Sequence, residues 1–225
     1  YQVYKTATFL ISWFEESLSK IFPLDMALNS VDDSYDGCRE KMANLVETKY
    51  LKKEMQSNFA NAWKHAEKNY KPPGDNLTKN HSIAIYDFNN AVHAIQILKK
   101  TQKECILTCR RTNVSFKKSV LNKEVRFGSF ASSSFNHTKT NVFGNKSCFK
   151  IYTCESANLT KYSKYDKEEE VLIPPYETFK VTAVKKRKHQ KDLWCDTVFT
   201  LKSSGKRSDL NCALFKKPSK TITKY

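Results

Sequence analysis

The sequence has no apolar run long enough to cross a membrane. The apolar stretch from Thr8 to Phe14 is short and is followed at once by Glu15 and Glu16, whereas a spanning helix needs about 20 consecutive apolar residues. A mean hydropathy of −0.62 and 28% charged residues are typical of a soluble protein. We expect residues 1–23 to form an N-terminal arm or the remnant of a signal peptide.

Histidine is scarce, and the cysteines include no Cys-x-x-Cys pair. With five histidines in 225 residues, the sequence predicts no metal site. It also has no zinc-finger spacing, no RNA-recognition signature and no glycine–lysine phosphate loop. These absences argue against metal-dependent proteins and against proteins that read a nucleic-acid sequence.

Acidic residues are in deficit, with 23 Asp and Glu against 39 Lys and Arg, which gives a net charge of +16. Such a charge attracts anionic surfaces in general. The basic residues are spread along the chain, with one dense cluster from Lys185 to His189. We expect a weak attraction to anionic surfaces and no specific nucleic-acid recognition. For the cluster itself, the alternative is a solvated turn between two strands.

The spacing of apolar residues changes along the chain. Three- and four-residue steps predict helix over residues 36–70, ended by Pro72, Pro73 and Gly74, and short helices over 81–100. After Cys105 the pattern predicts strands at residues 106–108, 125–130, 149–153, 171–173, 178–184 and 198–201. Helices first and strands after indicate an α+β fold, with an N-terminal helical segment followed by a mixed β-sheet core.

Three acidic residues, Glu168, Glu169 and Glu170, lead directly into the apolar run from Val171 to Ile173. The run predicts a buried strand. On an extended backbone Glu168 and Glu170 would share one face, with Glu169 on the other. Two carboxylates at the mouth of a buried strand can stabilise a developing cation and orient or deprotonate a nucleophile. The alternative is a solvated acidic cap on the strand.

Arg110, the run Phe130-x-Ser132-x-Ser134 and the pair Glu168-x-Glu170 follow one another along the chain. In this order they resemble the R-S-E motif of the vertebrate arginine-specific ecto-mono-ADP-ribosyltransferase family. The ending Glu-Glu-Glu-Val-Leu-Ile-Pro-Pro-Tyr-Glu and the segment Leu24-Asp25-Met26-Ala27 are similar to the same ectoenzymes. The resemblance implies one ADP-ribosyltransferase domain over residues 24–215, followed by a basic tail at 216–225.

The resemblance also implies an activity, namely transfer of ADP-ribose from NAD or NADP to arginine side chains of protein acceptors, with NAD hydrolysis as a side activity. NAD is then a substrate, and no metal takes part. Arg110 is implied to bind the pyrophosphate, and Ser132 to support the nicotinamide ribose and the catalytic carboxylate. Glu170 is implied to stabilise the oxocarbenium-like transition state, and Glu168 to engage the acceptor arginine.

The resemblance leaves the roles of several other residues open. Arg111, where relatives often have glycine, and Ser134 are expected to border the NAD. Tyr162 and Tyr165 lie where the family has its substrate loop and could stack on an acceptor guanidinium, or they are ordinary loop aromatics. Relatives carry an aromatic-rich helical segment before the counterpart of His93, which this chain lacks. The second hypothesis is therefore a catalytically impaired secreted binding protein on the same scaffold, and the third a basic secreted protein that acts by charge.

Cysteines and glycosylation sequons together favour an oxidising, secretory route. Sequons include those at Asn76, Asn113, Asn136, Asn145 and Asn158. The resemblance implies two disulfides, Cys38 with Cys212 and Cys105 with Cys154. It leaves Cys109, Cys148 and Cys195 unassigned, and the odd total means that at least one thiol is free or pairs between chains. We expect an extracellular, secreted monomer, or an anchored form where an anchor signal lies beyond this sequence.

Overall fold

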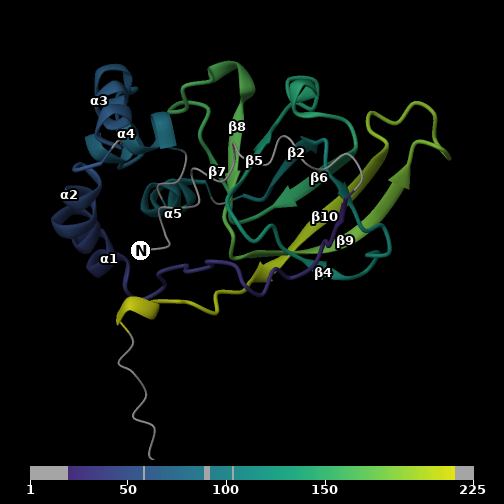
Figure 1. Cartoon of the computed structure of the whole chain (residues 1–225), viewed down its shortest axis with the longest axis horizontal. Coiled ribbons are helices and arrows are strands. Elements are labelled where there is room, and N and C mark those ends of the chain that lie inside the picture. Colours follow the sequence, from purple (N-terminus) through teal and green to yellow (C-terminus); the bar gives the residue numbers. More distant parts are fainter. Residues whose placement is uncertain (1–19, 58, 89–91, 103, 216–225) are drawn as a thin grey trace, which may run out of the picture.

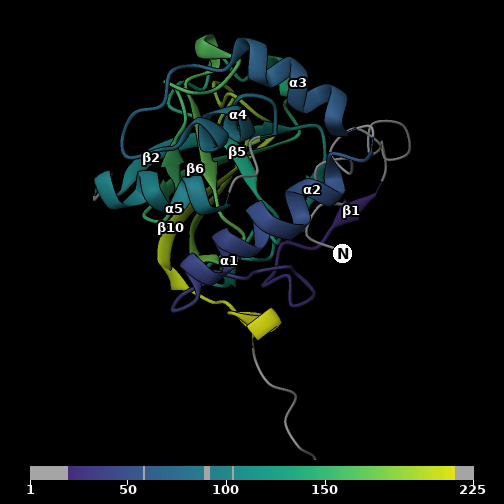
Figure 2. The ribbon, with the colours of Figure 1, turned by 90° about the vertical axis from the view of Figure 1, so that its left-hand side faces the viewer.

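The α-helices of the structure precede the strands of its main sheet, as the sequence predicts. The structure is a computed structural model, and it describes residues 20–57, 59–88, 92–102 and 104–215. Figures 1 and 2 show the helices gathered on one side of the sheet. They are α1 (Arg39–Leu45), the π-helical turn η2 (Val46–Tyr50), α2 (Leu51–Glu54), α3 (Phe59–Asn69), α4 (Lys79–Phe88) and α5 (Val92–Thr101). Within these ranges no helix has the length and apolar character that crossing a bilayer requires.

An eight-stranded mixed sheet forms the rest of the fold, in the order β4-β9-β10-β6-β2-β5-β8-β7. Its strands are β2 (Ile106–Thr112), β4 (Glu124–Val125), β5 (Ala131–Ser134), β6 (Ser147–Thr153), β7 (Ala157–Asn158), β8 (Glu170–Ile173), β9 (Glu177–Lys186) and β10 (Thr197–Lys206). β6 and β10 run parallel, and the other neighbours run antiparallel. β1 (Ile21–Phe22) and β3 (Ser115–Phe116) form a separate parallel pair. The predicted α+β class is confirmed.

The main hydrophobic core packs along the middle of this sheet. Every residue of β8 is buried, as the apolar run before Pro174 predicts. Phe149 of β6 and Phe199 of β10 stack with ring centroids 5.3 Å apart, and both are almost fully buried. Burying a side chain of this size stabilises the fold by about 1.5–3 kcal/mol. Ile173 of β8 belongs to the same core, so the core holds the strand that begins with a motif carboxylate.

The expected strand over residues 125–130 is wrong in its extent, because β4 stops before Arg126 and β5 covers the serines. The side chain of Arg126 turns inward, and its Nη1 lies 2.5 Å from Oδ2 of buried Asp32. Gly128 has a φ of +72°, and a Cβ there would lie 2.7 Å from the Cβ of Ala27. The inward arginine and the left-handed glycine end the ladder, so the motif serines lie on a strand and do not follow one.

The pair of Arg126 and Asp32 also fastens the two ends of the described chain. The carboxylate of Asp32 accepts hydrogen bonds from the N–H groups of Asp209 (3.0 Å) and Leu210 (2.9 Å). Burial by itself would raise the pKa of Asp32, but these hydrogen bonds and the Arg126 guanidinium outweigh it and lower that pKa. The segment after β10 is thus tied to the segment before α1.

Three disulfides cross-link the fold: Cys38–Cys212, Cys105–Cys154 and Cys148–Cys195. The first two are the pairs that the resemblance implies, and the third joins two cysteines that the sequence left unassigned. The first closes a separation of 174 residues, and it is worth about 5 kcal/mol in a chain-entropy account. Cys109 is free and buried. Such a set fits an oxidising, extracellular environment.

The basic cluster at residues 185–189 lies at the end of β9 and in the turn that follows. The N–H of His189 donates to the carbonyl oxygen of Lys186 at 3.0 Å, and the guanidinium of Arg187 lies 3.1 Å from Oδ1 of Asp196. The alternative interpretation of the cluster, a turn between two strands, is confirmed.

Candidate active site

Glu170 is the first residue of β8, and its side chain is nearly buried, with 3% of the residue exposed. Ser132 on the neighbouring strand β5 donates a hydrogen bond from Oγ to Oε1 of Glu170 at 2.7 Å. The antiparallel register of β5 and β8 places Ser134 opposite Glu170 and Ser132 opposite Leu172. The structure therefore brings together the serine and the carboxylate that the motif order singles out.

Arg110 joins the same arrangement from β2, the strand on the other side of β5. Its Nη1 donates to the backbone carbonyl oxygen of Ser132 at 2.6 Å. Burial lowers the pKa of Arg110, although a guanidinium stays charged at neutral pH. Arg110, Ser132 and Glu170 thus form a continuous chain of contacts across three adjacent strands.

Ser163 is a site residue that the sequence did not indicate. It is fully buried in the loop before β8, and its Oγ donates to Oε2 of Glu170 at 2.8 Å. Each oxygen of the Glu170 carboxylate is therefore met by a serine hydroxyl, which fixes the plane of the group. A single serine in a polar loop carries no sequence signal for this role, because such residues are common in loops.

The expectation that Glu168 and Glu170 share one face of an extended strand is wrong, because the backbone between them is not extended. Glu168 ends a short 3₁₀ turn, η4 (Asp166–Glu168), and Glu169 has a φ of +49°. The side chain of Glu169 points to Lys139, whose Nζ lies 2.7 Å from Oε1. The two flanking carboxyl groups still interact, since burial and then the charge of Glu170 raise the pKa of Glu168. A turn, and not a strand, builds the pair.

Arg111 lies apart from Arg110, as successive residues of a strand point to opposite faces. Its guanidinium sits over the ring of Trp194, 4.7 Å from the centroid, and its Nε donates to the carbonyl oxygen of His137 at 3.2 Å. Burial lowers its pKa. These contacts join Arg111 to two loops and not to Ser132, so a contact of Arg111 with NAD stays a prediction without support from this geometry.

Ser134 closes the end of β5. Its Oγ accepts a hydrogen bond from the N–H of Asn136 at 3.0 Å, and its carbonyl oxygen accepts one from Sγ of Cys109 at 3.2 Å. Burial raises the pKa of Cys109 to about 11, so this thiol is protonated at neutral pH. Ser134 borders the site through its backbone, next to Glu170, while its side chain shapes the turn that follows.

The two tyrosines of the loop before β8 lie differently. Tyr162 is 4% exposed and donates from its hydroxyl to Oδ2 of Asp75 at 2.7 Å, which ties the loop to the segment before α4. Burial raises its pKa to about 12. The suggestion that Tyr162 stacks on an acceptor guanidinium is wrong, because its side chain is buried and its hydroxyl is bound to Asp75. Tyr165 is 55% exposed and stays a candidate for that contact.

The five asparagines predicted as glycosylation sites lie at or near the surface, and so does Asn80, a sixth sequon that the prediction did not include. Asn76, Asn113 and Asn145 are exposed, and Asn136 and Asn158 are half-buried. Oδ1 of Asn113 accepts the N–H of Asn145 at 3.1 Å, so these two sequons adjoin. Glycosylation of the five stays a prediction.

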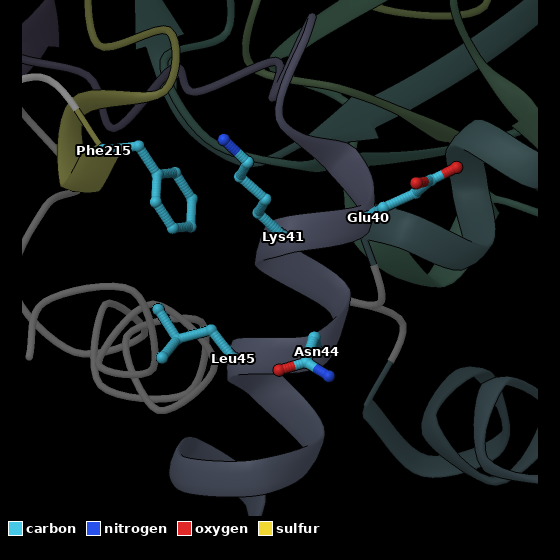
Figure 3. A pocket seen from close by; sticks show the side chains of 5 residues that line it. All are labelled: Glu40, Lys41, Asn44, Leu45 and Phe215. Carbon is cyan, nitrogen blue, oxygen red and sulfur yellow. The ribbon is translucent and has the colours of Figure 1, made fainter.

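Two hollows of the surface lie apart from this arrangement. Figure 3 shows one between α1 and the turn η5 (Ala213–Phe215), with Glu40, Lys41, Asn44, Leu45 and Phe215 around it. The other lies beside α5 and is bordered by Gln96 and Tyr176. Neither includes Arg110, Ser132 or Glu170, so the candidate site is defined by the contacts of its motif side chains. Within the described ranges, no group of three or more His, Cys, Asp and Glu side chains could hold a metal ion.

A guanidinium, a serine hydroxyl and a buried carboxylate on three adjacent strands of a mixed sheet, with a second carboxyl beside the first, define the ADP-ribosyltransferase class. Comparison with protein families agrees. The model of the family "NAD:arginine ADP-ribosyltransferase" matches residues 24–92 and 76–209. The chain belongs to this family.

Curated relatives cover most of the chain. Human ecto-ADP-ribosyltransferase 4 is 30% identical over 242 residues, which are 87% of this chain and 74% of the relative. Mouse T-cell ecto-ADP-ribosyltransferase 2 is 31% identical over 248 residues, 91% and 82% of the two chains. The mouse GPI-linked NAD(P)(+)–arginine ADP-ribosyltransferase 1 is 28% identical, with 86% and 74% covered. By their names these relatives are ecto-enzymes or GPI-linked, and the three disulfides of this chain fit the same extracellular setting.

Solved structures confirm the fold. The crystal structure of the eucaryotic mono-ADP-ribosyltransferase ART2.2 matches with a TM-score of 0.69 and 23% identity, and the match covers 87% of this chain and all of that one. A mutant of ART2.2 in complex with NADH matches with a TM-score of 0.63 and 26% identity over the same shares. The α+β architecture of this chain is that of an ADP-ribosyltransferase.

Proposed function

We propose that this protein transfers ADP-ribose from NAD to arginine side chains of protein acceptors, releases nicotinamide, and hydrolyses NAD when water replaces the acceptor. One observation carries the proposal: the chain of contacts from Arg110 through Ser132 to Glu170. In addition, burial and then the charge of Glu170 raise the pKa of Glu168.

Glu170 is proposed to stabilise the transition state. Cleavage of the bond between nicotinamide and ribose develops positive charge on the ribose ring, as glycoside cleavage does. Nicotinamide leaves with the bonding electrons, so an anion must already lie beside the ring. The carboxylate of Glu170 is buried and oriented by the hydroxyls of Ser132 and Ser163. It needs little reorganisation, which is the condition under which one charged group contributes most to catalysis.

Arg110 is proposed to bind the pyrophosphate of NAD. A guanidinium matches phosphate oxygens with two parallel hydrogen bonds, and Arg110 already points toward the strand that carries Ser132. NADP would meet the same guanidinium, since its nicotinamide half and pyrophosphate are unchanged.

Glu168 is proposed to engage the acceptor. An arginine must lose a proton as one of its nitrogens attacks the ribose carbon, and a carboxylate can take it. Burial and the charge of Glu170 raise the pKa of Glu168, which makes it a stronger base than an ordinary glutamate. The transferred group then forms a bond to the arginine nitrogen, and the proton moves to Glu168.

We also propose a single domain over residues 24–215 that acts outside the cell as a secreted monomer. The disulfide Cys38–Cys212 and the contacts of Asp32 with the segment after β10 support one unit. The net charge of +16 supports a weak attraction of this unit to anionic surfaces.

The second candidate is a catalytically impaired binding protein on the same scaffold. It is favoured by the division of the family match into two pieces, residues 24–92 and 76–209, around the place where the sequence lacks a helical segment of its relatives. Loss of packed core residues is costly, about 2–5 kcal/mol for a single large-to-small change.

Incubation of the oxidised protein with NAD and agmatine, a small arginine analogue, separates the two candidates. Nicotinamide together with ADP-ribosyl-agmatine is the expected result. Nicotinamide alone would contradict arginine transfer. Neither product, from protein that unfolds cooperatively, would contradict catalysis and support the binding protein.

A further inference from the structure

We propose that Lys139 is a positioning residue of this site, because its ion pair with Glu169 holds the turn that sets Glu168 against Glu170. The pair thereby governs how much ADP-ribose reaches arginine and how much reaches water. This inference rests on the proposed function.

Glu169 has a backbone conformation that its side chain does not favour. Its φ of +49° is in the left-handed region, where the Cβ of an L-residue crowds the following carbonyl group. Glycine, asparagine and aspartate visit that region most readily, and glutamate much less often. A residue persists there only where its surroundings fix it. The turn between the two motif carboxylates therefore needs an external support.

The loop after β5 supplies that support. Nζ of Lys139 lies 2.7 Å from Oε1 of Glu169, and the two side chains are 35% and 36% exposed. The N–H of Phe135, in the same loop, points to the carbonyl oxygen of Glu169 at 3.4 Å. The loop thus contacts Glu169 through both its side chain and its backbone.

The loop is itself anchored on both sides of Lys139. The carbonyl oxygen of His137 accepts hydrogen bonds from Nε of Arg111 at 3.2 Å and from Oγ1 of Thr140 at 2.8 Å. The guanidinium of Arg111 lies over Trp194, whose ring centroid is 5.4 Å from that of His137. Arg111 therefore helps to hold the loop in place, and the backbone that carries Lys139 is fixed on both sides.

The two carboxylates depend on Lys139 to different degrees. Glu170 begins a buried strand and is held by Ser132 and Ser163, neither of which belongs to the loop. Glu168 precedes the left-handed residue, and its backbone N–H donates to the carbonyl oxygen of Tyr165 at 2.9 Å. Loss of the ion pair should move Glu168 more than Glu170, and arginine transfer should suffer more than cleavage of NAD.

The test measures the ratio of ADP-ribosyl-agmatine to free ADP-ribose in Lys139→Met and in a matched control, Lys146→Met. Lys146 forms a surface pair with Asp196 at 3.4 Å, with side chains 48% and 42% exposed. We expect the ratio to fall about two- to fivefold in Lys139→Met, the size of effect that a partly exposed ion pair supports, and to stay at the wild-type value in Lys146→Met. An equal ratio in all three proteins would overturn the inference.

Two substitutions of Glu169 separate the backbone from the charge. Glu169→Asn and Glu169→Val both remove the ion pair, but asparagine tolerates a positive φ and a β-branched valine does not. The ratio should fall further in Glu169→Val. In the Lys139→Met background, Glu169→Asn should restore at least half of the lost ratio. If Asn and Val behaved alike, the turn geometry would not be what Lys139 supports.

A readout without turnover keeps this inference apart from the proposed function. If the wild type formed no product at all, the proposed function would fail, and the carboxyl carbon of Glu168 could still be titrated by NMR in wild type and Lys139→Met. A midpoint displaced in Lys139→Met and unchanged in Lys146→Met would support the positioning role. The same midpoint in all three would overturn it.

Discussion

Ser132 and Glu170 are separated by 38 residues in sequence, and their side chains meet through a hydrogen bond of 2.7 Å between Oγ and Oε1. The contact exists because β5 and β8 are neighbours in the sheet. Ser163 completes it from the opposite oxygen. A carboxylate whose two oxygens both accept hydrogen bonds has a fixed orientation, so its negative charge stays at one place in the site.

Removal of the Ser163 hydroxyl should slow the release of nicotinamide. A hydrogen bond to a charged group contributes about 1.5–3 kcal/mol, so Ser163→Ala is expected to lower kcat about tenfold or more. The measurement is nicotinamide release at saturating NAD. Ser133→Ala is the matched control, because Ser133 is also buried but donates to the carbonyl oxygen of Val171 at 2.9 Å. Equal losses in both variants would mean that general packing, and not the orientation of Glu170, is responsible.

Glu168→Gln should separate transfer from hydrolysis. The amide cannot take a proton from the acceptor, so ADP-ribosyl-agmatine should fall about 10²-fold, the lower end of what general acid–base catalysis contributes, while free ADP-ribose continues to form. In the wild type the ratio of the two products should also fall as the pH falls through the raised pKa of Glu168. Persistence of wild-type transfer in Glu168→Gln would refute the role of this residue as base.

The acidic motif shows how far the sequence alone could go. The apolar run after it predicts β8 correctly, because a short apolar segment between charged residues and prolines is typical of a buried strand. The pairing of Glu168 with Glu170 was also predicted, but from an extended backbone. The structure obtains it from a left-handed Glu169, whose support comes from Lys139, 30 residues away. No local pattern encodes a contact of that kind.

Arg126→Met should destabilise the fold strongly. It leaves the carboxylate of Asp32 buried without its cation, a change that typically costs about 3–5 kcal/mol. The measurement is the free energy of unfolding in urea. Arg207→Met is the control, since its pair with Asp209 is largely exposed, and it should cost less than about 1 kcal/mol. Similar losses in both would contradict a buried, fold-defining pair.

Glu177→Gln should stabilise the protein at neutral pH. Glu177 is fully buried, and burial raises its pKa even though Thr153 and the N–H of Cys154 donate to it. Because the folded-state pKa of Glu177 is raised, the fold favours the protonated carboxyl group. The stability that this group contributes is fully present below the unfolded pKa and is lost as the pH rises through the folded pKa. The stability gap between Glu177→Gln and wild type should therefore close in acid. A gap that does not change between pH 7 and pH 4 would contradict the burial of a charge.

The remaining misses share one physical cause. The sequence predicted a strand over residues 125–130, but Arg126 is buried by a partner 94 residues away. The third disulfide, Cys148–Cys195, depends on the parallel register of β6 and β10, which cysteine spacing does not reveal. Ser163 reaches Glu170 only once the loop is folded. Local sequence patterns indicate most of the helices and strands, and long-range pairing decides which side chains meet.

The most direct test of the central claim is single-turnover release of nicotinamide from NAD by wild type and Glu170→Gln, with Glu124→Gln as an exposed control on β4. The exchange keeps the size of the side chain and removes the charge. The amide oxygen can still accept from one of the two serine hydroxyls, and the amide NH2 donates to the other, which must turn to accept. We predict a loss of about 10²–10³-fold in Glu170→Gln and wild-type release in Glu124→Gln. Equal release by all three proteins would contradict the assignment of Glu170 as the catalytic carboxylate.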